Sequence, residues 1–362
     1  MKQSWKFDKD FLEEIIETGQ EMLKKDDIPV EKKDLITATV LKFSEFLSAL
    51  NNNYVDPELN NDFDLDMNSI KNRFLAKAKK DYEKYCDEFI DFIIAFDEEC
   101  TELTFDDEIY QTDDTPERIV ENSLNIYKEF FPDFYETAKD IIDCPLSLIN
   151  FSKNGVIESQ CYYERFLELP FMHVGEYDKN PTTFIHELQH GVEWLQKYDS
   201  DIYFKELGSI LMETLYIDKM AERGEDNASL LYFERIKVAE QYLRYLANYF
   251  RILVRLNAVD YNIDSNEFLN LLCINEDIAD FTYMLNIDCD ECLTYLMSFW
   301  KSLEIRQSLY RDKKFGAYKL NKTLTEGEVY YDDYDLLEYY NDYLNEIITK
   351  NEENQYTKKK RK

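Results

Sequence analysis

The chain has 362 residues, 44% of them hydrophobic, and a formal net charge of −33. This length allows one large domain or two ordinary ones, and the apolar content excludes a chain that is disordered throughout. The negative charge argues against a nucleic acid partner, because a phosphate backbone would be repelled. It indicates a strongly solvated surface or, alternatively, a field that attracts basic substrates.

The scarcity of Gly (8) and Pro (7) favours a mainly helical protein. Apolar residues recur at three- and four-residue spacing through the first 140 residues, as they do on helices with one buried face. This pattern predicts an N-terminal helical region over residues 1–144. Its helices are expected at residues 11–23, 33–50, 70–96 and 116–142.

The sequence becomes richer in β-forming residues after Pro145. Residues 156–163 and 167–174 predict a hairpin, and Pro170 indicates that the second strand lies at an edge of its sheet. Asn180 is a suitable N-cap and Pro181 suits a first helical turn, so we expect a helix to begin there.

The C-terminal part returns to helical patterns, at residues 205–222, 230–261, 290–310 and 335–350. We therefore expect a second region over residues 145–350. The basic residues 351–362 then form a disordered, solubilising tail or, as the alternative, a nucleic-acid-binding or sorting signal. CDEC at residues 289–292 is a weak signal for zinc or redox chemistry, because no second pair follows it.

The sequence contains no apolar run of the length that a signal peptide or a membrane span needs. Its seven cysteines are odd in number and irregularly spaced, which is typical of reduced thiols. These features predict a soluble cytoplasmic protein with no membrane partner.

The stretch HELQH, residues 186–190, holds two of the three histidines. Residues four apart lie on one face of a helix, so His186 and His190 can direct both imidazoles at one metal ion. Glu187 can then reach a water molecule beside the ion and act as a general base, which is the arrangement of zinc hydrolases. The alternative is two unrelated surface histidines. With only three histidines in 362 residues, a chance occurrence of two of them four residues apart around a glutamate is a poor explanation.

The flanking residues Ile185, Leu188, Val192 and Leu195 form a separate apolar stripe that can anchor this helix. A catalytic zinc needs a third protein ligand, and no histidine follows His190. The helix predicted at residues 205–222 offers two acids on one face, Glu206 and Glu213, either of which could serve.

At this point the chain resembles the M3 metallopeptidases, the group of thimet oligopeptidase and oligoendopeptidase F. The resemblance rests on PFMHVGEYDKNPTTFIHELQH (residues 170–190) and ELGSILME (residues 206–213), with YFRILVRLNAVDY (residues 249–261) as a weaker match. It implies a helical zincin-like fold with a small β-hairpin or sheet before the active-site helix. It also implies one Zn²⁺ per chain with Glu206 as the third ligand, and Glu213 then supports a zinc histidine unless it is itself the ligand.

Three features depart from the family pattern. Gln189 stands where the family usually has glycine, the gap from His190 to Glu206 is short, and no late histidine is present to support the substrate carbonyl. Tyr295 is a candidate donor to that carbonyl or a packing residue. His173 is a candidate substrate contact or a partly buried strand residue.

The predicted function is hydrolysis of peptide bonds, with short peptides as substrates as the resemblance implies. We expect the strand before the active-site helix to pair with the substrate backbone. An inactive zincin-like scaffold that acts as a binding or regulatory protein is the main alternative, and a metalloprotease with one dedicated protein substrate is a weaker one.

Overall fold

The computed structural model describes residues 9–25, 28–50, 67–99, 112, 114–144, 149–153, 159–164, 169–198, 204–225, 228–272 and 287–326. Within these ranges the chain is mainly helical, with a small sheet directly before the helix that carries HELQH, as predicted. The expected helix at residues 335–350 and the expected tail at residues 351–362 lie outside the described residues.

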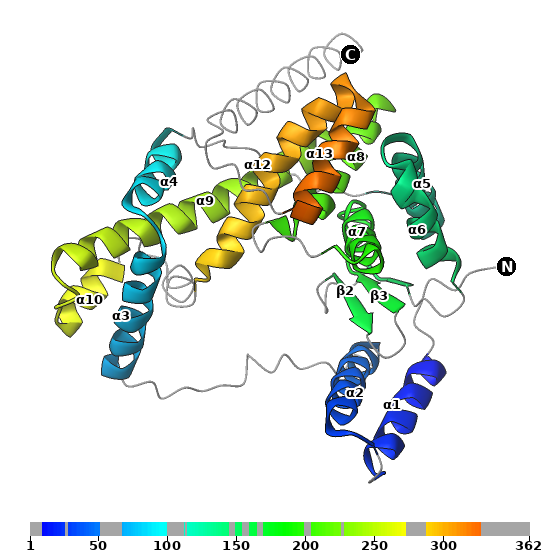
Figure 1. Cartoon of the computed structure of the whole chain (residues 1–362), viewed down its shortest axis with the longest axis horizontal. Helices are drawn as coiled ribbons and strands as arrows, with labels where there is room; N and C mark the ends of the chain where they lie inside the picture. The colour runs from blue at the N-terminus through cyan, green and yellow to red at the C-terminus, as the bar shows by residue number, and fades with distance from the viewer. Residues whose placement is uncertain are drawn as a thin grey trace.

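The helices before the sheet are α1 (Lys9–Leu23), α2 (Val30–Leu50), α3 (Met67–Lys84), α4 (Asp87–Glu99), α5 (Pro116–Phe130) and α6 (Pro132–Asp143). Those after it are α7 (Thr183–Gln196), α8 (Leu207–Glu222), α9 (Ala228–Ala258), α10 (Ser265–Leu272), α12 (Cys289–Arg311) and α13 (Lys313–Glu326). Figure 1 shows α7 between the sheet and the pair α8 and α12, with the long helix α9 leading from there to α3, α4 and α10.

Two stretches predicted as single helices are each divided in two. The break between α5 and α6 falls at Phe131, directly before Pro132. A residue before proline is driven out of the helical region, and Phe131 has φ −136° and ψ 67°. The stretch at residues 70–96 divides between Lys84 and Asp87. The helices α10 and α13 were not predicted.

The sheet has the strand order β1 (Ile149–Phe151), β3 (Leu169–Val174), β2 (Gln160–Glu164). The strands β2 and β3 are antiparallel, as the predicted hairpin requires, with Cys161 opposite Met172. The prediction that β3 is an edge strand is wrong, because β1 pairs with it in parallel on its other side. Pro170 is compatible with this central position because it is the second residue of the strand, where a missing N–H interrupts little of the ladder.

The two faces of the sheet are covered by different helices. Phe171 of β3 belongs to a small apolar cluster with residues of α1 and α2, and its ring lies 5.0 Å from that of Phe43. Met172 and Val174 point to the other face and join the large core that extends from α3 to α13. Figure 1 accordingly shows α1 and α2 on one side of the strands and α7 on the other.

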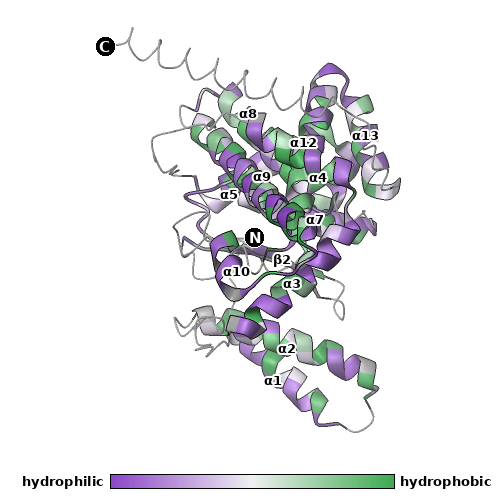
Figure 2. Cartoon of the chain, turned by 90° about the vertical axis from the view of Figure 1, so that its left-hand side faces the viewer, coloured by the Kyte–Doolittle hydropathy of each residue, from purple (hydrophilic) through white to green (hydrophobic). Residues whose placement is uncertain are grey.

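Most of these helices are amphipathic, and Figure 2 shows hydrophilic and hydrophobic residues alternating along α1, α2 and the outer helices. The helix α8 differs, since all its residues from Leu207 to Asp218 are buried, and it packs against α7, α9 and α12. Among the described helices, none combines the length and the hydrophobicity that a membrane crossing requires.

Candidate metal centre

The helix α7 begins two residues later than the sequence suggested. Thr182 is its N-cap residue and Thr183 its first residue, so Pro181 lies before the helix. Asn180 still supports this start, because its Oδ1 accepts hydrogen bonds from the backbone N (3.2 Å) and from Oγ1 (2.7 Å) of Thr182. His186 therefore lies one turn inside the helix, as expected.

The apolar side of α7 anchors it as predicted. Ile185, Leu188 and Val192 are fully buried, and Leu195 is partly buried against the same core. Gly191 lets the helix approach β3, since a Cβ there would lie 3.1 Å from Cε of Met172. The packing fixes the rotation of α7, and His186 and His190 then project together from another side.

The two histidines meet an acid at the start of α8. Glu206 occupies the N-cap position of that helix. Its Oε2 lies 3.2 Å from Nε2 of His186 and 3.3 Å from Nε2 of His190, and the two Nε2 atoms lie 3.2 Å apart. Among the described residues, these three side chains form the one group that could hold a metal ion.

The spacing of these three atoms fits a tetrahedral ion of the size of zinc. Bonds of about 2.0–2.1 Å to nitrogen and oxygen place neighbouring ligand atoms about 3.3–3.4 Å apart. The observed separations of 3.2, 3.2 and 3.3 Å are close to this. Oε2 of Glu206 is also buried and makes no hydrogen bond of acceptable geometry with any described residue. A metal ion would satisfy this atom.

Glu213, two turns further along α8, lies on the opposite side of the His186 ring from Glu206. Its Oε1 is 2.5 Å from Nδ1 of His186, and its Oε2 forms an ion pair with Arg235 of α9. The structure thus brings both candidate acids to His186, but to different ring nitrogens. Sequence reasoning missed Arg235, because nothing in the spacing of α9 separates it from the other basic residues there.

Neighbouring charges shift the pKa values of His186 and Glu206. Burial by itself would lower the pKa of His186, but Glu213 and Glu206 outweigh it and leave the pKa well above its ordinary value. Burial would likewise raise the pKa of Glu206, but the two histidines leave it far below its ordinary value. Without an ion, the histidines therefore hold protons that a metal would have to displace.

Glu187 is buried beside the two histidines, with 5% of its surface exposed. Burial raises the pKa of its carboxyl, and the adjacent imidazoles of His186 and His190 oppose part of that rise. A raised pKa favours a general base, because the proton affinity then moves towards neutral pH. The position is the one that the HELQH pattern predicts for such a base.

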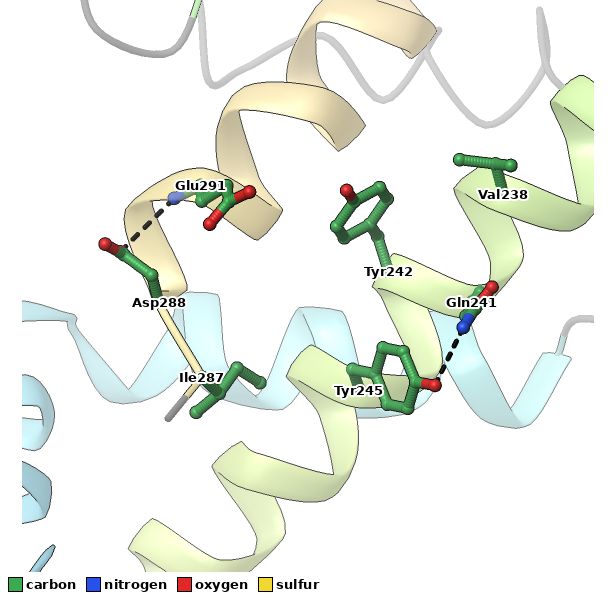
Figure 3. Close-up of a pocket in the computed structure, with 7 residues that line it drawn as sticks. All are labelled: Val238, Gln241, Tyr242, Tyr245, Ile287, Asp288 and Glu291. Atoms are coloured by element: carbon green, nitrogen blue, oxygen red, sulfur yellow. Dashed lines mark hydrogen bonds between the residues drawn. The ribbon is translucent and has the colours of Figure 1, made fainter. Parts of the chain in front are cut away.

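Tyr295 of α12 packs against α9. Its ring stacks on that of Tyr242 of α9, with ring centres 4.9 Å apart and planes 4° from parallel. Burial and then the charge of Glu206 raise its pKa, so the hydroxyl stays protonated and can donate a hydrogen bond. Tyr242 also lines a pocket of about 380 Å³ between α9 and the start of α12, shown in Figure 3 with Tyr245 and Glu291.

His173 lies away from the three ligand atoms. Its place in β3, between Met172 and Val174, puts it on the face of the sheet that α2 covers. There Nδ2 of Asn150 lies 2.8 Å from its Nδ1, and the ring of Phe46 is 6.2 Å away. The structure therefore does not bring His173 to the candidate centre.

A series of buried hydrogen bonds joins α5 to α7 beside the histidines and lies against the start of α8. The hydroxyl of Tyr127 donates to Oε1 of Gln189 (2.9 Å), and Nε2 of Gln189 donates to Oε1 of Glu193 (2.8 Å). Burial raises the pKa of Glu193 to about 7. Gly208 of α8 has no side chain, and this leaves the space that the side chains of Gln189 and Glu193 occupy. Gln189, which departs from the family pattern, is therefore a fully buried residue with both amide atoms bonded.

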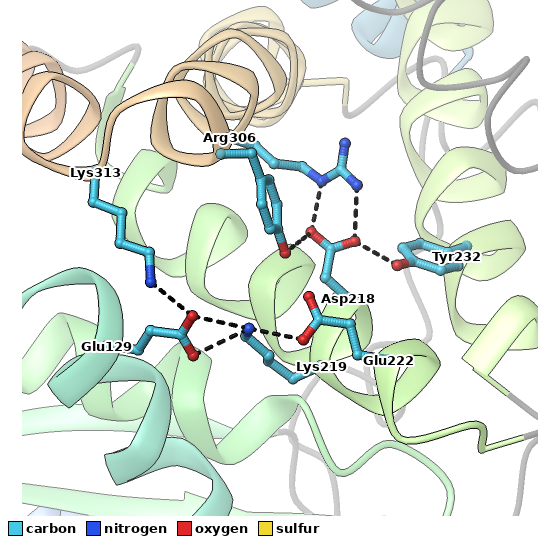
Figure 4. A network of polar contacts seen from close by, with 8 residues as sticks. Glu129, Asp218, Lys219, Glu222, Tyr232, Arg306 and Lys313 are labelled. Carbon is cyan, nitrogen blue, oxygen red and sulfur yellow. Dashed lines mark hydrogen bonds and ion pairs between the residues drawn. The ribbon is translucent and has the colours of Figure 1, made fainter.

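A second buried network holds α12 against α8. Asp218 of α8 accepts hydrogen bonds from Nε (2.7 Å) and Nη2 (2.9 Å) of Arg306, and from the hydroxyl of Tyr310 (3.0 Å). Tyr232 of α9 contacts its other side, and Figure 4 shows Asp218 surrounded by these groups. The network fixes α12, which carries Tyr295, relative to α8, which has Glu206 as its N-cap residue.

The sequence matches no protein-family profile and no curated protein. The structure is similar to that of a putative oligoendopeptidase F from Bacillus anthracis str. Ames, with a TM-score of 0.43 and 14% identity over 89% of this chain. It is also similar to Pz peptidase A with an inhibitor, with a TM-score of 0.38 and 14% identity over 86% of this chain. The chain spans less than two-thirds of the length of either neighbour, 63% and 62% respectively.

Proposed function

We propose that this protein is a zinc-dependent peptidase of M3-like type that hydrolyses short peptides. The observation that carries the proposal is the arrangement of His186, His190 and Glu206, whose ligand atoms lie 3.2–3.3 Å apart. Nitrogen and carboxylate ligands in this geometry suit zinc, and three protein ligands leave a fourth position for chemistry. When bound, zinc supplies a Lewis acid that polarises a carbonyl group and makes a water molecule more acidic.

The residues of the chain would then have separate tasks. Glu187 takes a proton from the attacking water and passes it to the departing amine, which a buried carboxylate next to the ligands is placed to do. Tyr295, whose hydroxyl stays protonated, donates a hydrogen bond to the oxygen of the substrate carbonyl. Glu213 holds the Nδ1 side of His186.

Peptide backbone would pair with the strand β2 and not with β3. The strand β3 has neighbours on both sides, whereas no other described strand pairs with the outer edge of β2. The strand β2 packs against α7, where the ring of Tyr163 is 5.6 Å from that of Trp194. Trp194 in turn lies one helical turn after His190, with ring centres 6.3 Å apart. An extended peptide on β2 would therefore pass close to the metal ligands.

The proposal is tested with a library of quenched fluorescent peptides and three proteins: wild type, Glu187→Gln and the control Glu136→Gln, an exposed acid on α6. We expect zinc-loaded wild type and the control to cleave members of the library. The Glu187→Gln protein should keep its zinc and lose about 10²–10⁴-fold in rate, because an amide cannot accept the proton. Equal rates for wild type and Glu187→Gln would refute the proposed mechanism.

An inactive metal-binding scaffold is the second candidate. It is favoured by the absence of any histidine after His190, since a late histidine is part of the carbonyl support in the family that the sequence resembles. Zinc binding without cleavage of any peptide in the library would support this candidate over the peptidase.

A further inference from the structure

The carboxylate of Glu213 is held from two sides. Only 2% of the side chain is exposed, Oε1 lies 2.5 Å from Nδ1 of His186, and Oε2 forms an ion pair with Nη2 of Arg235. Each oxygen thus has a different partner, an imidazole on α7 and a guanidinium on α9. Glu213 itself lies on α8, so this chain of contacts joins the three helices that surround the candidate centre.

We infer that Arg235 is a positioning residue of the metal centre, acting through Glu213 on His186. This inference rests on the proposed metal site and deepens it. The first reason is orientational. The last torsion of a glutamate side chain is broad, so one contact does not fix the plane of the carboxylate. A second contact from Arg235 does, and it keeps Oε1 directed at His186.

The second reason is electrostatic. A carboxylate removed from water is strongly disfavoured unless an opposite charge lies close to it. Arginine is charged at all ordinary pH values, so Arg235 supplies this charge whether or not a metal ion is bound. The side chain of Arg235 is 21% exposed, and it therefore links the buried acid to the protein surface.

The consequence for His186 concerns which ring nitrogen carries the proton. Oε1 of Glu213 faces Nδ1 of His186 at 2.5 Å, and a carboxylate at this place favours the tautomer with its proton on Nδ1, which leaves the lone pair of Nε2 directed towards Glu206 and His190. Without Arg235, one contact fewer would hold the carboxylate of Glu213, and its oxygens would be free to turn away from Nδ1. The proton of the ring would then no longer be held on Nδ1, and a proton on Nε2 blocks the nitrogen that would bind the metal.

The test compares Arg235→Gln, Arg235→Lys and a control, Arg244→Gln, an exposed arginine on the same helix. Zinc affinity is measured by competition with a chromophoric chelator. We expect Arg235→Gln to lose about 10–100-fold, the usual effect of removing a residue that supports a ligand. Arg235→Lys, which keeps the charge but not the fork of N–H groups, should recover part of the loss, and Arg244→Gln should bind as wild type does.

A double-variant cycle separates positioning from general structural support. If Arg235 acts through Glu213, Arg235→Gln should cause no further loss of zinc affinity in a Glu213→Gln background. Losses that simply add, or wild-type affinity in Arg235→Gln, would overturn the inference. Thermal unfolding of each variant shows whether it is folded, and the Arg235→Lys protein serves in the cycle should Arg235→Gln fail to fold.

A second readout does not depend on zinc binding. The chain has only three histidines, so ¹⁵N NMR of the imidazole nitrogens gives few signals, and His186→Ala assigns those of His186. The signal of Nδ1 of His186, the nitrogen that faces Glu213, should shift in Arg235→Gln and much less in Arg244→Gln. An unchanged His186 signal in Arg235→Gln overturns the inference even in zinc-free protein. Failure of wild type to bind zinc would instead refute the proposed function.

Discussion

Gln189 of α7 and Gly208 of α8 lie in direct contact, so the two helices can approach only because residue 208 has no side chain. A Cβ on Gly208 would lie 2.8 Å from Nε2 of Gln189 and would overlap Oε1 of Glu193. The departure from the family pattern at Gln189 is thus matched by a glycine on the facing helix. Gln189 directly precedes His190 in α7, so this contact adjoins the histidine pair.

Gly208→Ala should destabilise the protein by about 1–3 kcal/mol, the range for adding a methyl group to a fully packed interior. The matched control is Gly191→Ala, where the nearest atom is the flexible end of Met172 at 3.1 Å. That substitution should have a smaller effect, because the Met172 side chain can move. Denaturant unfolding of both variants measures the difference, and equal destabilisation would show that the contact with Gln189 and Glu193 is not restrictive.

The local part of this arrangement could be predicted from the sequence. The i, i+4 histidines and the stripe Ile185, Leu188 and Val192 follow from helical periodicity, and the structure confirms that the stripe is buried. The centre of the sheet could not be predicted, because the partner β1 is a strand of only three residues that joins β3 from the far side. Periodicity within one segment carries no information about such a partner.

Contacts between side chains on different helices could not be predicted from the sequence either. Glu213 and Arg235 lie on α8 and α9, and Asp218 and Arg306 are 88 residues apart. Each of these acids has many basic residues as possible partners in the sequence, and only the packing angles of the helices select one. Sequence reasoning could name Glu206 and Glu213 as candidates, but the different ring nitrogens that they contact are a product of that packing.

Glu193→Gln should stabilise the protein more at high pH than at low pH. Burial raises the pKa of Glu193 from 4.5 to about 7, so the folded state binds the proton more tightly than the unfolded state. The stabilisation from this proton is complete below about pH 4.5 and is lost as the pH rises through about 7. The difference of about 2.5 pKa units corresponds to about 3 kcal/mol as an order of magnitude.

Unfolding free energies of wild type and Glu193→Gln should therefore diverge in favour of the variant between about pH 5.5 and pH 8. The lower limit stays above the isoelectric point of about 4.4, where solubility is lowest. Because the two proteins share all other titrating groups, their difference isolates Glu193. A difference that is constant with pH would mean that Glu193 is ionised in the folded protein throughout this range.

Arg306→Met should destabilise the protein by about 3–5 kcal/mol, because it leaves the carboxylate of Asp218 buried without its cation. Asp218 is 4% exposed and Arg306 is 9% exposed, so water cannot replace the lost contacts. The double variant Asp218→Leu/Arg306→Met removes both charges and should recover much of the stability. Chemical denaturation of both proteins provides the comparison, and a double variant less stable than Arg306→Met would contradict this account.

Glu206→Gln and Glu213→Gln should differ in how firmly they retain zinc. Loss of one of only three protein ligands should weaken binding more than the about 10–100-fold expected for a residue that supports a ligand. Glu206→Gln should therefore release zinc at chelator concentrations that Glu213→Gln withstands. If Glu213→Gln loses its metal first, the two acids have exchanged roles.

Elemental analysis of the purified protein tests the central claim most directly. The ligand atoms of His186, His190 and Glu206 lie 3.2–3.3 Å apart, which predicts one zinc ion per chain in wild type. The same measurement on the His186→Ala/His190→Ala protein should show the zinc content reduced to background, with the fold checked by circular dichroism. Wild type without stoichiometric metal, or a double variant that is fully loaded, would contradict the claim.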